Sequence, residues 1–347
     1  MMKFKERFYE KEIPKNITCY LGADIGGTNS NFGIFTVQDK KLILLFSLHF
    51  KSQEIVNFTD VVKQVLQYGQ LKYNISIKKS CFAAAGIVSE DHDYCKPTNL
   101  NFALSSQEIL EKTDLTCAKI VNDFEIIGHG INEVDQNSLV LINKEQKARK
   151  NSARAIVGAG TGLGKCIMHW HPSVGRHLPV PSEGGHGDFA VHNQVEFDLI
   201  IFIQKLENFS CAISWEDVLS GSGIQRMYTF FKQKLNIKNG KNLHPDEIFN
   251  ARHQDQAAFE TFQLYTKLYA RCAKNFALDA LALGGVYIAG GIASKNLEMF
   301  KQKEFLQEFI NCGKQQQALQ KIPIYIITDY NISLYGAAAY MLLEGLC

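Results

Sequence analysis

The chain has 347 residues, of which 46% are hydrophobic and 21% charged, and these values predict a folded globular protein of about two domains. Its formal net charge of +2 argues against the strong positive field of a protein that binds nucleic acid or an anionic membrane. Nine cysteines occur without C-x-x-C spacing, so we expect neither a disulfide framework nor a zinc site, but reduced thiols in an intracellular protein.

At the N-terminus, the mixed run from Lys3 to Arg7 is interpreted as a solvated start of the chain rather than as a binding surface. These residues lack the apolar core of a signal peptide. No apolar run approaches the roughly 20 residues that cross a bilayer. We therefore expect a cytoplasmic protein that has neither a membrane nor a nucleic acid as its partner.

The next feature is an apolar strand that enters a glycine turn and is followed by a second strand. Paired glycines, Gly26 and Gly27, allow close approach to the backbone N–H groups, and Thr28 and Asn29 add polar donors. Such donors suit phosphate oxygens, while the carboxylate of Asp24 suits a hydrated Mg²⁺ ion. A plain β-hairpin, whose glycines merely permit positive φ, explains this turn equally well at this point.

The remaining strands and helices follow from apolar periodicity and capping residues. Helical patterns dominate from 194 to 283, and the aromatic stripe of Phe262, Tyr265 and Tyr269 is predicted to be core. The alternation of strands and helices is typical of an α/β layer architecture. Strands are predicted at 41–50, 75–85, 119–121, 155–157, 286–292 and 322–328, and helices at 58–66, 105–110, 257–280 and 334–343.

A second glycine-rich turn covers residues 158–164. A dinucleotide fingerprint would open a helix and be followed by an acidic residue about 20 positions later. Residues 165–170 instead predict a strand, which disfavours a dehydrogenase. Neither turn matches the P-loop pattern. Two strand–turn–strand units indicate two related α/β halves with a site between them.

Several polar residues suit a ligand with many hydroxyl groups. Asn122 and Asp123 end a predicted strand, Glu183 and His186 flank two glycines, and Glu216 lies in the first turn of a predicted helix. An Asp beside an alcohol can accept its proton, as a kinase requires. Other roles stay open: Asp123 can cap a helix, the helix dipole favours Glu216 without any ligand, and His186 can be an ordinary loop histidine.

A metal site is the alternative for His169, His171 and His177. Alternate residues of a strand share one face, so these imidazoles could converge. No carboxylate or cysteine is arranged with them, which disfavours this hypothesis.

Six motifs, taken in order, resemble those of the bacterial glucokinase family within the actin/hexokinase/Hsp70 ATPase superfamily. Each motif alone is weak, but their common order is specific, and together they extend from Leu21 to Leu343. They are the first phosphate motif at 23–29, the connecting motif at 120–125, the second phosphate loop at 160–164, sugar-binding segments at 182–189 and 216–221, the adenosine motif at 285–292 and the closing helix at 335–338.

The resemblance implies an α/β protein with the two-domain ribonuclease-H-like, actin-type ATPase fold and an interdomain cleft. Residues 1–133 plus 327–347 would form a small α/β domain, and residues 134–326 a large one. The implied activity is that of a glucokinase, which phosphorylates the 6-hydroxyl of glucose with MgATP in the first step of glycolysis. The resemblance further implies a homodimer.

The site residues are carried over from the matching motifs. Asp123 would be the general base on the 6-hydroxyl, and Asp24 would orient Mg²⁺ through water. The residues that would bind the sugar are Asn99, Asn122, Asp123, Glu183, His186 and Glu216. The residues that would bind ATP are Asp24, Gly26, Gly27, Thr28, Asn29, Gly160, Thr161 and Gly162, with Gly290 and Gly291 beside the adenine.

The chain also departs from the family pattern. Ser30 and Asn31 stand where the family commonly shows Ala-Arg, so one basic contact is missing, and Phe102 lies where a Trp is frequent. The zinc-binding cysteine cluster of the repressor/kinase relatives is absent after His186.

Two rival functions stay open. A kinase for another hexose, such as mannose or an N-acetylated amino sugar, would keep the same motifs. A non-enzymatic sugar-sensing regulator would need a DNA-binding helical domain ahead of the first phosphate motif. Only about 16 residues precede that strand, which argues against the regulator.

Overall fold

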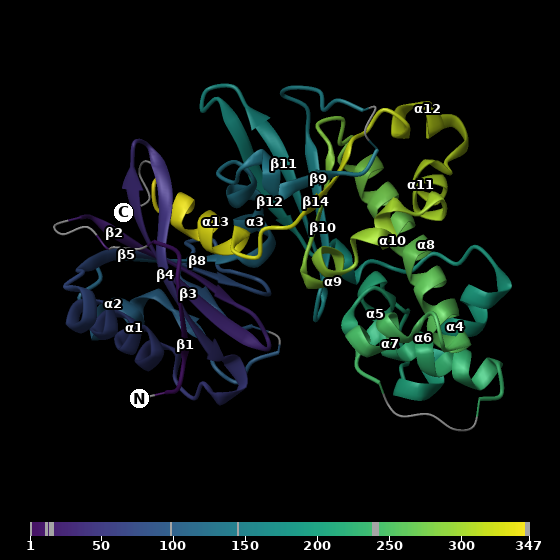
Figure 1. Ribbon diagram of the computed structural model, residues 1–347, viewed down its shortest axis with the longest axis horizontal. Helices are drawn as coiled ribbons and strands as arrows, with labels where there is room; N and C mark the ends of the chain where they lie inside the picture. The colour runs from purple at the N-terminus through teal and green to yellow at the C-terminus, as the bar shows by residue number, and fades with distance from the viewer. Residues whose placement is uncertain are drawn as a thin grey trace. The chain divides into compact units, whose positions relative to one another are not determined.

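The computed structural model describes residues 2–10, 13, 17–97, 99–143, 146–237 and 243–343 (Figure 1). The chain divides into two compact units, each described by itself below. Unit 1 consists of Met1–Gln136 with Asp329–Cys347, and unit 2 of Asn137–Thr328. That 1–133 plus 327–347 and 134–326 are the domains of the protein stays a prediction. No helix in the described ranges is both long and apolar enough to traverse a membrane.

Unit 1 is built on a six-stranded sheet whose strand order is β1-β4-β3-β2-β5-β8. Strands β2, β5 and β8 run parallel, whereas β3, β4 and β1 are joined to β2 by successive antiparallel pairings. The predicted strands of this region are confirmed. Their bounds are β1 Lys5–Phe8, β2 Cys19–Ile25, β3 Asn29–Gln38, β4 Lys41–Lys51, β5 Ile77–Ala84 and β8 Cys117–Asn122.

The N-terminal run, expected to be only a solvated start, forms the edge strand β1. Lys5 lies opposite His49 of β4, and the ring of Phe4 lies 5.4 Å from that of Phe50. Lys5 and Arg7 are exposed on this strand. Charged side chains on an edge strand discourage pairing with another chain. The short alternation of charged and aromatic residues therefore marked a strand rather than a loop.

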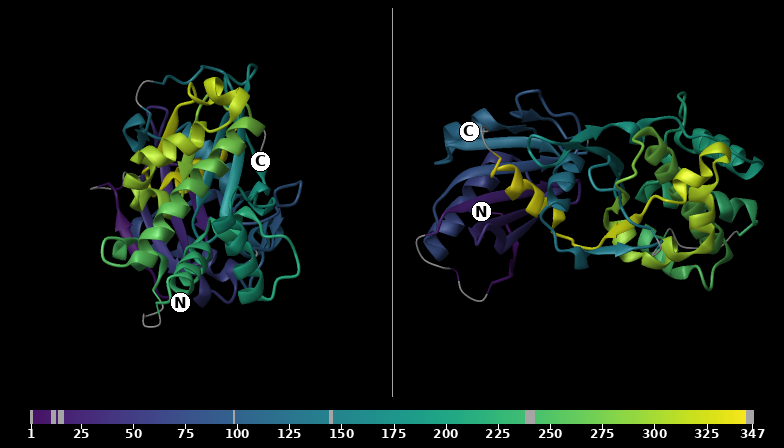
Figure 2. Two further views of the ribbon diagram at one scale, coloured as in Figure 1. Left: turned by 90° about the vertical axis from the view of Figure 1, so that its right-hand side faces the viewer. Right: turned by 90° about the horizontal axis from the view of Figure 1, so that it is seen from above.

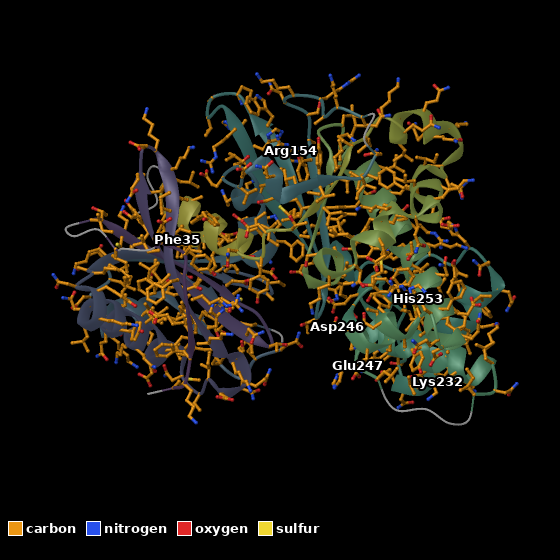
Figure 3. All side chains as sticks on the ribbon, viewed as in Figure 1. Phe35, Arg154, Lys232, Asp246, Glu247 and His253 are labelled. Carbon is orange, nitrogen blue, oxygen red and sulfur yellow. The ribbon has the colours of Figure 1, made fainter. Side chains whose placement is uncertain are left out.

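Helices cover both faces of the unit 1 sheet (Figure 1). The close approach of α13 to β2 requires Gly22, since a Cβ there would lie 2.7 Å from the Leu334 carbonyl oxygen. On the same face, Phe35 of β3, labelled in Figure 3, stacks edge-on against Tyr335 at 5.1 Å. The helices of this unit are α1 Phe58–Tyr73, α2 Ser106–Lys112, α3 Asp123–Ile131 and α13 Ile332–Tyr340, with a small ladder of β6 Tyr94–Cys95 and β7 Leu104–Ser105.

Five strands of unit 2 repeat the strand pattern of unit 1, and the sixth, β9, pairs antiparallel with β14 at the other end of the sheet. The sheet order of this unit is β12-β11-β10-β13-β14-β9, with β10, β13 and β14 parallel and β11 and β12 antiparallel. The two predicted α/β halves are thus visible in the topology, and each half has a glycine turn in its first hairpin. The strands are β9 Leu139–Leu141, β10 Arg154–Ala159, β11 Leu163–His171, β12 Arg176–Ser182, β13 Val286–Ala289 and β14 Ile324–Ile327.

The helices of unit 2 are centred on α8, which contains the predicted aromatic stripe (Figure 2). Phe262, Tyr265 and Tyr269 are buried, as predicted. The Tyr269 hydroxyl accepts a hydrogen bond from the Ala159 amide at 3.1 Å, which ties α8 to the end of β10. The helices are α4 Gln194–Glu207, α5 Trp215–Val218, α6 Gly221–Lys234, α7 Pro245–Ala251, α8 Gln256–Asp279, α9 Gly291–Lys295, α10 Leu297–Lys301, α11 Lys303–Ile310 and α12 Gln316–Leu319.

A buried ionic network joins three of these helices. Arg271 of α8 donates to both oxygens of Glu196 on α4, at 2.8 and 3.0 Å, and to Glu308 of α11 at 2.8 Å. Arg271 and Glu196 are 3% and 1% exposed, so neither charge is solvated by water. A buried pair of this kind fixes how the helices dock.

The metal hypothesis for the three histidines is contradicted by strand register. His177 lies opposite Trp170, so it shares the face of Trp170 and not that of His169 and His171. Its imidazole stacks on Trp170 at 5.3 Å, and Nε2 lies 2.9 Å from the Ser152 carbonyl oxygen. Within the described residues, no three His, Cys, Asp or Glu side chains are grouped as metal ligands would be.

Among the described residues, seven cysteines are in no disulfide bond, as the expectation of reduced thiols requires, whereas Cys117 is disulfide-bonded, contrary to it.

Candidate active site

The parallel strands of unit 1 end along one edge of the sheet. Ile25, Ala84 and Asn122 are aligned in a single row across β2, β5 and β8. Asp24 lies one residue before this row and Asp123 one residue after it, so both lie at the same edge of the sheet, with β5 between their strands. Ligands of open α/β sheets bind at the carboxyl ends of the strands.

The first glycine turn connects β2 to β3 as a tight hairpin, in which the Gly26 amide donates to the Asn29 carbonyl oxygen at 3.0 Å. Neither Gly26 nor Gly27 has a positive φ, so conformational need does not explain these glycines. Thr28 and Asn29 are exposed at the tip. The turn is therefore a hairpin whose polar side chains and backbone are accessible to a ligand.

A side chain that the sequence reasoning missed connects this turn to a second segment. Gln53 Nε2 donates to the Gly27 carbonyl oxygen at 2.9 Å and to the Asn99 carbonyl oxygen at 3.3 Å. Asn99 is thereby held close to the phosphate turn. Gln53 lies in a 3-10 turn, Ser52–Glu54, directly after β4, and such a glutamine carries no sequence signal of its own.

Asp24 lies on the face of β2 that α13 covers and is partly exposed. Burial raises the pKa of its carboxyl to about 6, although a hydrogen bond from Ser333 of α13 works in the opposite direction. The charged form is destabilised in these surroundings, and a nearby cation would offset this. The donor set, a carboxylate beside backbone groups and a hydroxyl, is suitable for hydrated Mg²⁺.

The start of α3 places the proposed base. Asn122 is the N-cap: its Oδ1 accepts from the amides of Phe124 and Glu125 at 2.9 and 3.2 Å, and its Nδ2 donates to the Gly86 carbonyl oxygen at 3.2 Å. The capping role considered for Asp123 thus belongs mainly to Asn122. Asp123 is the first helical residue, and its Oδ1 also accepts from the Phe124 amide, at 3.0 Å. Contact of Asn122 with the sugar stays a prediction.

One residue further into α3, Glu125 lies in surroundings unlike those of an ordinary surface carboxylate. Burial raises the pKa of Glu125 to about 7. The carboxyl is therefore partly protonated at neutral pH. It is a second titrating group in the same helical turn as Asp123.

The second glycine turn of the chain lies in unit 2, and Glu216 holds its backbone in place. Glu216 Oε2 accepts from the Leu163 amide at 2.8 Å, and a Cβ on Gly162 would lie 2.5 Å from that oxygen. The Gly221 amide donates to the Gly160 carbonyl oxygen at 2.9 Å. Thr161 is exposed at the tip of the turn. The strand predicted after this turn is β11, which contradicts a dinucleotide fingerprint.

The proposed sugar segment contains a short 3-10 helix, Gly184–His186. The side chains of Glu183 and His186 are 53% and 59% exposed, and His186 Nε2 lies 3.7 Å from Glu183 Oε2. Gly185 is required by packing, because a Cβ there would lie 1.9 Å from the Leu163 carbonyl oxygen. Both polar side chains are therefore available to a ligand, on a backbone that packs against the second glycine turn.

A backbone hydrogen bond brings Glu216 close to the segment that contains Glu183 and His186. The Trp215 amide donates to the Gly187 carbonyl oxygen at 3.0 Å. Unit 2 thus assembles Glu183, His186 and Glu216 beside the second turn, three side chains that are separated in sequence.

Lys165 anchors the sugar segment from the sheet. Its Nζ donates to the Gly184 carbonyl oxygen at 2.9 Å and lies 5.2 Å from the centre of the Phe276 ring. The residue is only 5% exposed, so this charge acts within the fold.

We expect Lys165→Met to raise the KM for glucose by about tenfold with little change in kcat, since a hydrogen bond from a charged donor contributes about 1.5–3 kcal/mol.

Steady-state kinetics with varied glucose measure this effect. Lys234→Met is the matched control, because Lys234 makes an exposed ion pair with Asp198. A Lys165→Met enzyme with an unchanged KM would show that the segment is held without this lysine.

The last glycine motif lies at the end of β13, which is parallel to β10 with Ala289 opposite Gly158. Gly290 has φ +92°, and a Cβ there would lie 2.5 Å from the Ala159 carbonyl oxygen. Among the described residues, no atom lies within 4 Å of the position that a Cβ on Gly291 or Gly160 would take. This backbone is open to a ligand, as a phosphate or adenine site requires.

Comparison with known proteins bears directly on this arrangement. The profile of the glucokinase family matches residues 21–344. The chain belongs to the glucokinase family. A glucokinase of Trichormus variabilis is 31% identical over 93% of this chain and 98% of its own. A crystal structure of a glucokinase from an Antarctic psychrotroph is similar with a TM-score of 0.76, at 26% identity over 94% of this chain and 99% of that one.

A more distant structure shows the same fold with ligands. It is a ROK family glucokinase from Streptomyces griseus in complex with glucose and AMPPNP, with a TM-score of 0.63, 16% identity, and coverage of 93% of this chain and 99% of that one. The predicted family, the actin-type α/β fold and the assignment as a hexokinase-type phosphotransferase are confirmed. The roles of individual residues stay predictions.

Proposed function

We propose that this enzyme transfers the γ-phosphoryl group of MgATP to the 6-hydroxyl of glucose, with Asp123 as the general base. The observation that carries the proposal is that Asp24 and Asp123 flank the aligned ends of β2 and β8 at the carboxyl edge of the unit 1 sheet. One carboxylate is then available for the metal and one for the proton. Membership of the glucokinase family and the glucose and AMPPNP bound by the Streptomyces griseus enzyme support the choice of substrates.

Asp123 performs the acid–base step. Its carboxylate accepts the proton of the sugar hydroxyl as the oxygen attacks the phosphorus atom. The Asn122 cap and the Phe124 amide fix the carboxylate at the first turn of α3. A fixed orientation lowers the entropy that must be lost at the moment of reaction.

The residues around the first turn fit a metal-bound nucleotide. Gly26, Gly27, Thr28 and Asn29 would donate to phosphate oxygens, and Asp24 would hold Mg²⁺ through water. When bound, Mg²⁺ neutralises the negative charge that builds up on the phosphate oxygens.

Unit 2 would supply further binding groups. The accessible backbone at Gly160, Thr161 and Gly162 would donate to phosphate, and that at Gly290 and Gly291 would lie along the adenine. Such donors suit anionic oxygens because backbone N–H groups carry positive partial charge.

Sugar selection would rest on Glu183, His186 and Glu216 together with Asn99. A carboxylate accepts from sugar hydroxyls, whereas an imidazole or amide can donate to them. Glu216 keeps Oε1 for the sugar while Oε2 is bound to Leu163.

Assembly and location also belong to this proposal. We carry over the homodimer from the family resemblance, and light scattering would then give twice the mass of one chain. A cytoplasmic location fits the seven cysteines of the described residues that are in no disulfide bond.

The proposed activity is tested with a panel of sugars and MgATP, measured as ADP formed. We expect glucose to give the highest kcat/KM and to outcompete mannose and N-acetylglucosamine, and removal of Mg²⁺ with a chelator to abolish turnover. Faster turnover of another sugar would assign the enzyme to that hexose. No sugar-dependent ADP with any of them would favour a sugar-sensing regulator.

A further inference from the structure

A row of polar side chains crosses the unit 1 sheet on the face that α13 covers. Asp24 of β2 lies directly opposite Asn31 of β3, and Asn31 lies directly opposite His49 of β4. Directly opposed residues share a face with their Cβ atoms about 5 Å apart. Asn31 is thus the immediate neighbour of the carboxylate proposed to hold Mg²⁺.

Hydrogen bonds fix the orientation of this row. His49 Nδ1 lies 2.6 Å from Asn31 Oδ1, and His49 Nε2 lies 2.7 Å from the Ser47 hydroxyl. Ser47 in turn is 3.3 Å from the Tyr9 hydroxyl, which donates to Asn331 at the start of α13. The chain of contacts therefore extends from Asn31 to Tyr9, which follows β1, and to Asn331, at the start of α13.

The chemistry of these contacts determines where the protons lie. Burial, together with the charges of Arg7 and Lys5, lowers the pKa of His49 to about 4, so the ring is neutral. An amide oxygen only accepts, so His49 carries its proton on Nδ1 and donates to Asn31. Nε2 is then the acceptor, and the Ser47 hydroxyl donates to it.

This arrangement leaves the amide nitrogen of Asn31 unused. Asn31 is 6% exposed, and its Nδ2 has no hydrogen-bond partner in the part of the chain that the structure describes. Since Oδ1 is bonded to His49, Nδ2 is the part of the amide left for another partner, on a residue directly opposite Asp24. This nitrogen is not among the described buried side-chain atoms that lack a hydrogen-bond partner, so it is accessible to a ligand.

The chemistry of an N–H donor selects the ligand atom. Water bound to Mg²⁺ donates its protons and cannot accept from Asn31, whereas a phosphate oxygen accepts. The position is also the one at which the resembled family commonly carries Arg, a residue that likewise only donates. A neutral amide is a weaker donor than guanidinium, so its orientation matters more.

We propose that Asn31 is a further ligand-binding residue of the nucleotide site, donating from Nδ2 to a phosphate oxygen of ATP, and that His49 is the residue that positions it. The inference rests on the proposed function, because it takes Asp24 and the first turn as the phosphate site. His49 does not touch the ligand and acts only through Asn31.

The experiment measures binding of AMPPNP with Mg²⁺ by calorimetry, separately from glucose binding. Asn31→Asp replaces the donor by a negatively charged acceptor of the same shape, and we expect AMPPNP affinity to fall by tenfold or more with glucose affinity within twofold. Asn31→Ala serves as the second variant, with a smaller loss of AMPPNP affinity. Asn31→Arg restores a donor, and we expect affinity at or above that of the unmodified enzyme.

The positioning role is tested through His49. His49→Phe removes the bond to Asn31, and we expect a severalfold loss of AMPPNP affinity that His49→Gln, which can donate to Asn31, partly restores. Ring nitrogen shifts in the unmodified protein should show the Nδ1–H tautomer.

Unchanged AMPPNP affinity in Asn31→Asp and Asn31→Ala would overturn the inference, as would equal losses of AMPPNP and glucose binding, which indicate a structural role. The proposed function is judged separately, by glucose-dependent ADP formation in the unmodified enzyme. That activity can stand while the role of Asn31 fails.

Discussion

Asp123→Asn is expected to lower kcat for glucose phosphorylation by about 10³-fold while glucose still binds. An amide cannot accept the proton of the 6-hydroxyl, and general base catalysis contributes about 10² to 10⁴-fold. The replacement keeps the shape of the side chain and an oxygen that can still accept from the Phe124 amide. The loss therefore reports the proton transfer and not the start of α3.

The measurement combines kcat from ADP release with the glucose Kd from calorimetry. Glu125→Gln is the matched control, because it also removes a carboxyl group from the first turn of α3. We expect its kcat to stay within a few-fold of that of the unmodified enzyme. If Asp123→Asn turns over at a near-normal rate, another group is the base and the mechanism above is wrong.

Arg271→Met is expected to produce the largest loss of stability in unit 2, about 3–5 kcal/mol. Methionine leaves the carboxylates of Glu196 and Glu308 without their shared partner, and Glu196 is only 1% exposed. An uncompensated buried charge is far less favourable than the intact pair. Urea unfolding followed by circular dichroism measures the change.

Double replacement gives the control. Arg271→Met combined with Glu196→Leu removes both buried charges, and we expect it to be more stable than Arg271→Met alone. If the two variants are equally stable, the cavity and not the unpaired charge explains the loss.

The same pair predicts a pH dependence. Burial alone raises the pKa of Glu196, but the hydrogen bonds from Arg271, the His192 amide and Asn193, with the charge of Arg271, together more than offset this, so the pKa lies below its usual value. The carboxylate therefore stabilises the fold at every pH above its value in the unfolded chain, and this contribution is lost as pH falls through the lowered pKa. Below that range the stability gap between the unmodified and Arg271→Met proteins should narrow.

Local pattern predicted much of the fold. Apolar periodicity found α8 and its buried stripe at Phe262, Tyr265 and Tyr269, because helix packing imposes a repeat of 3.6 residues on the sequence itself. The glycine turns at Gly26 and Gly160 were found for a similar reason, since backbone accessibility requires a missing side chain. The order of six motifs, these two turns among them, then sufficed to predict the family.

Features that depend on distant pairing could not be predicted. The register that separates His177 from His169 is set by how β11 and β12 align. The bonds of Gln53 to Gly27 and Asn99 join segments 26 and 46 residues apart. No local spacing encodes such contacts.

The residue that caps α3 was left open for a different reason. Asn122 and Asp123 are adjacent, and both residue types cap helices well. Only the backbone decides between them, and it places Asn122 at the cap.

Glu216 has a consequence for how the two substrates influence each other. One of its oxygens, Oε2, holds the backbone of the second glycine turn through Leu163, and the other, Oε1, has no hydrogen-bond partner among the residues that the structure describes. A sugar hydroxyl that donates to Oε1 would make Oε2 a weaker acceptor for the Leu163 amide. A phosphate bound to the turn would depend on the same hydrogen bond, because that bond holds the turn in place. The affinities for sugar and nucleotide are then not independent quantities. By thermodynamic reciprocity, whatever factor glucose imposes on nucleotide affinity, the nucleotide imposes equally on glucose.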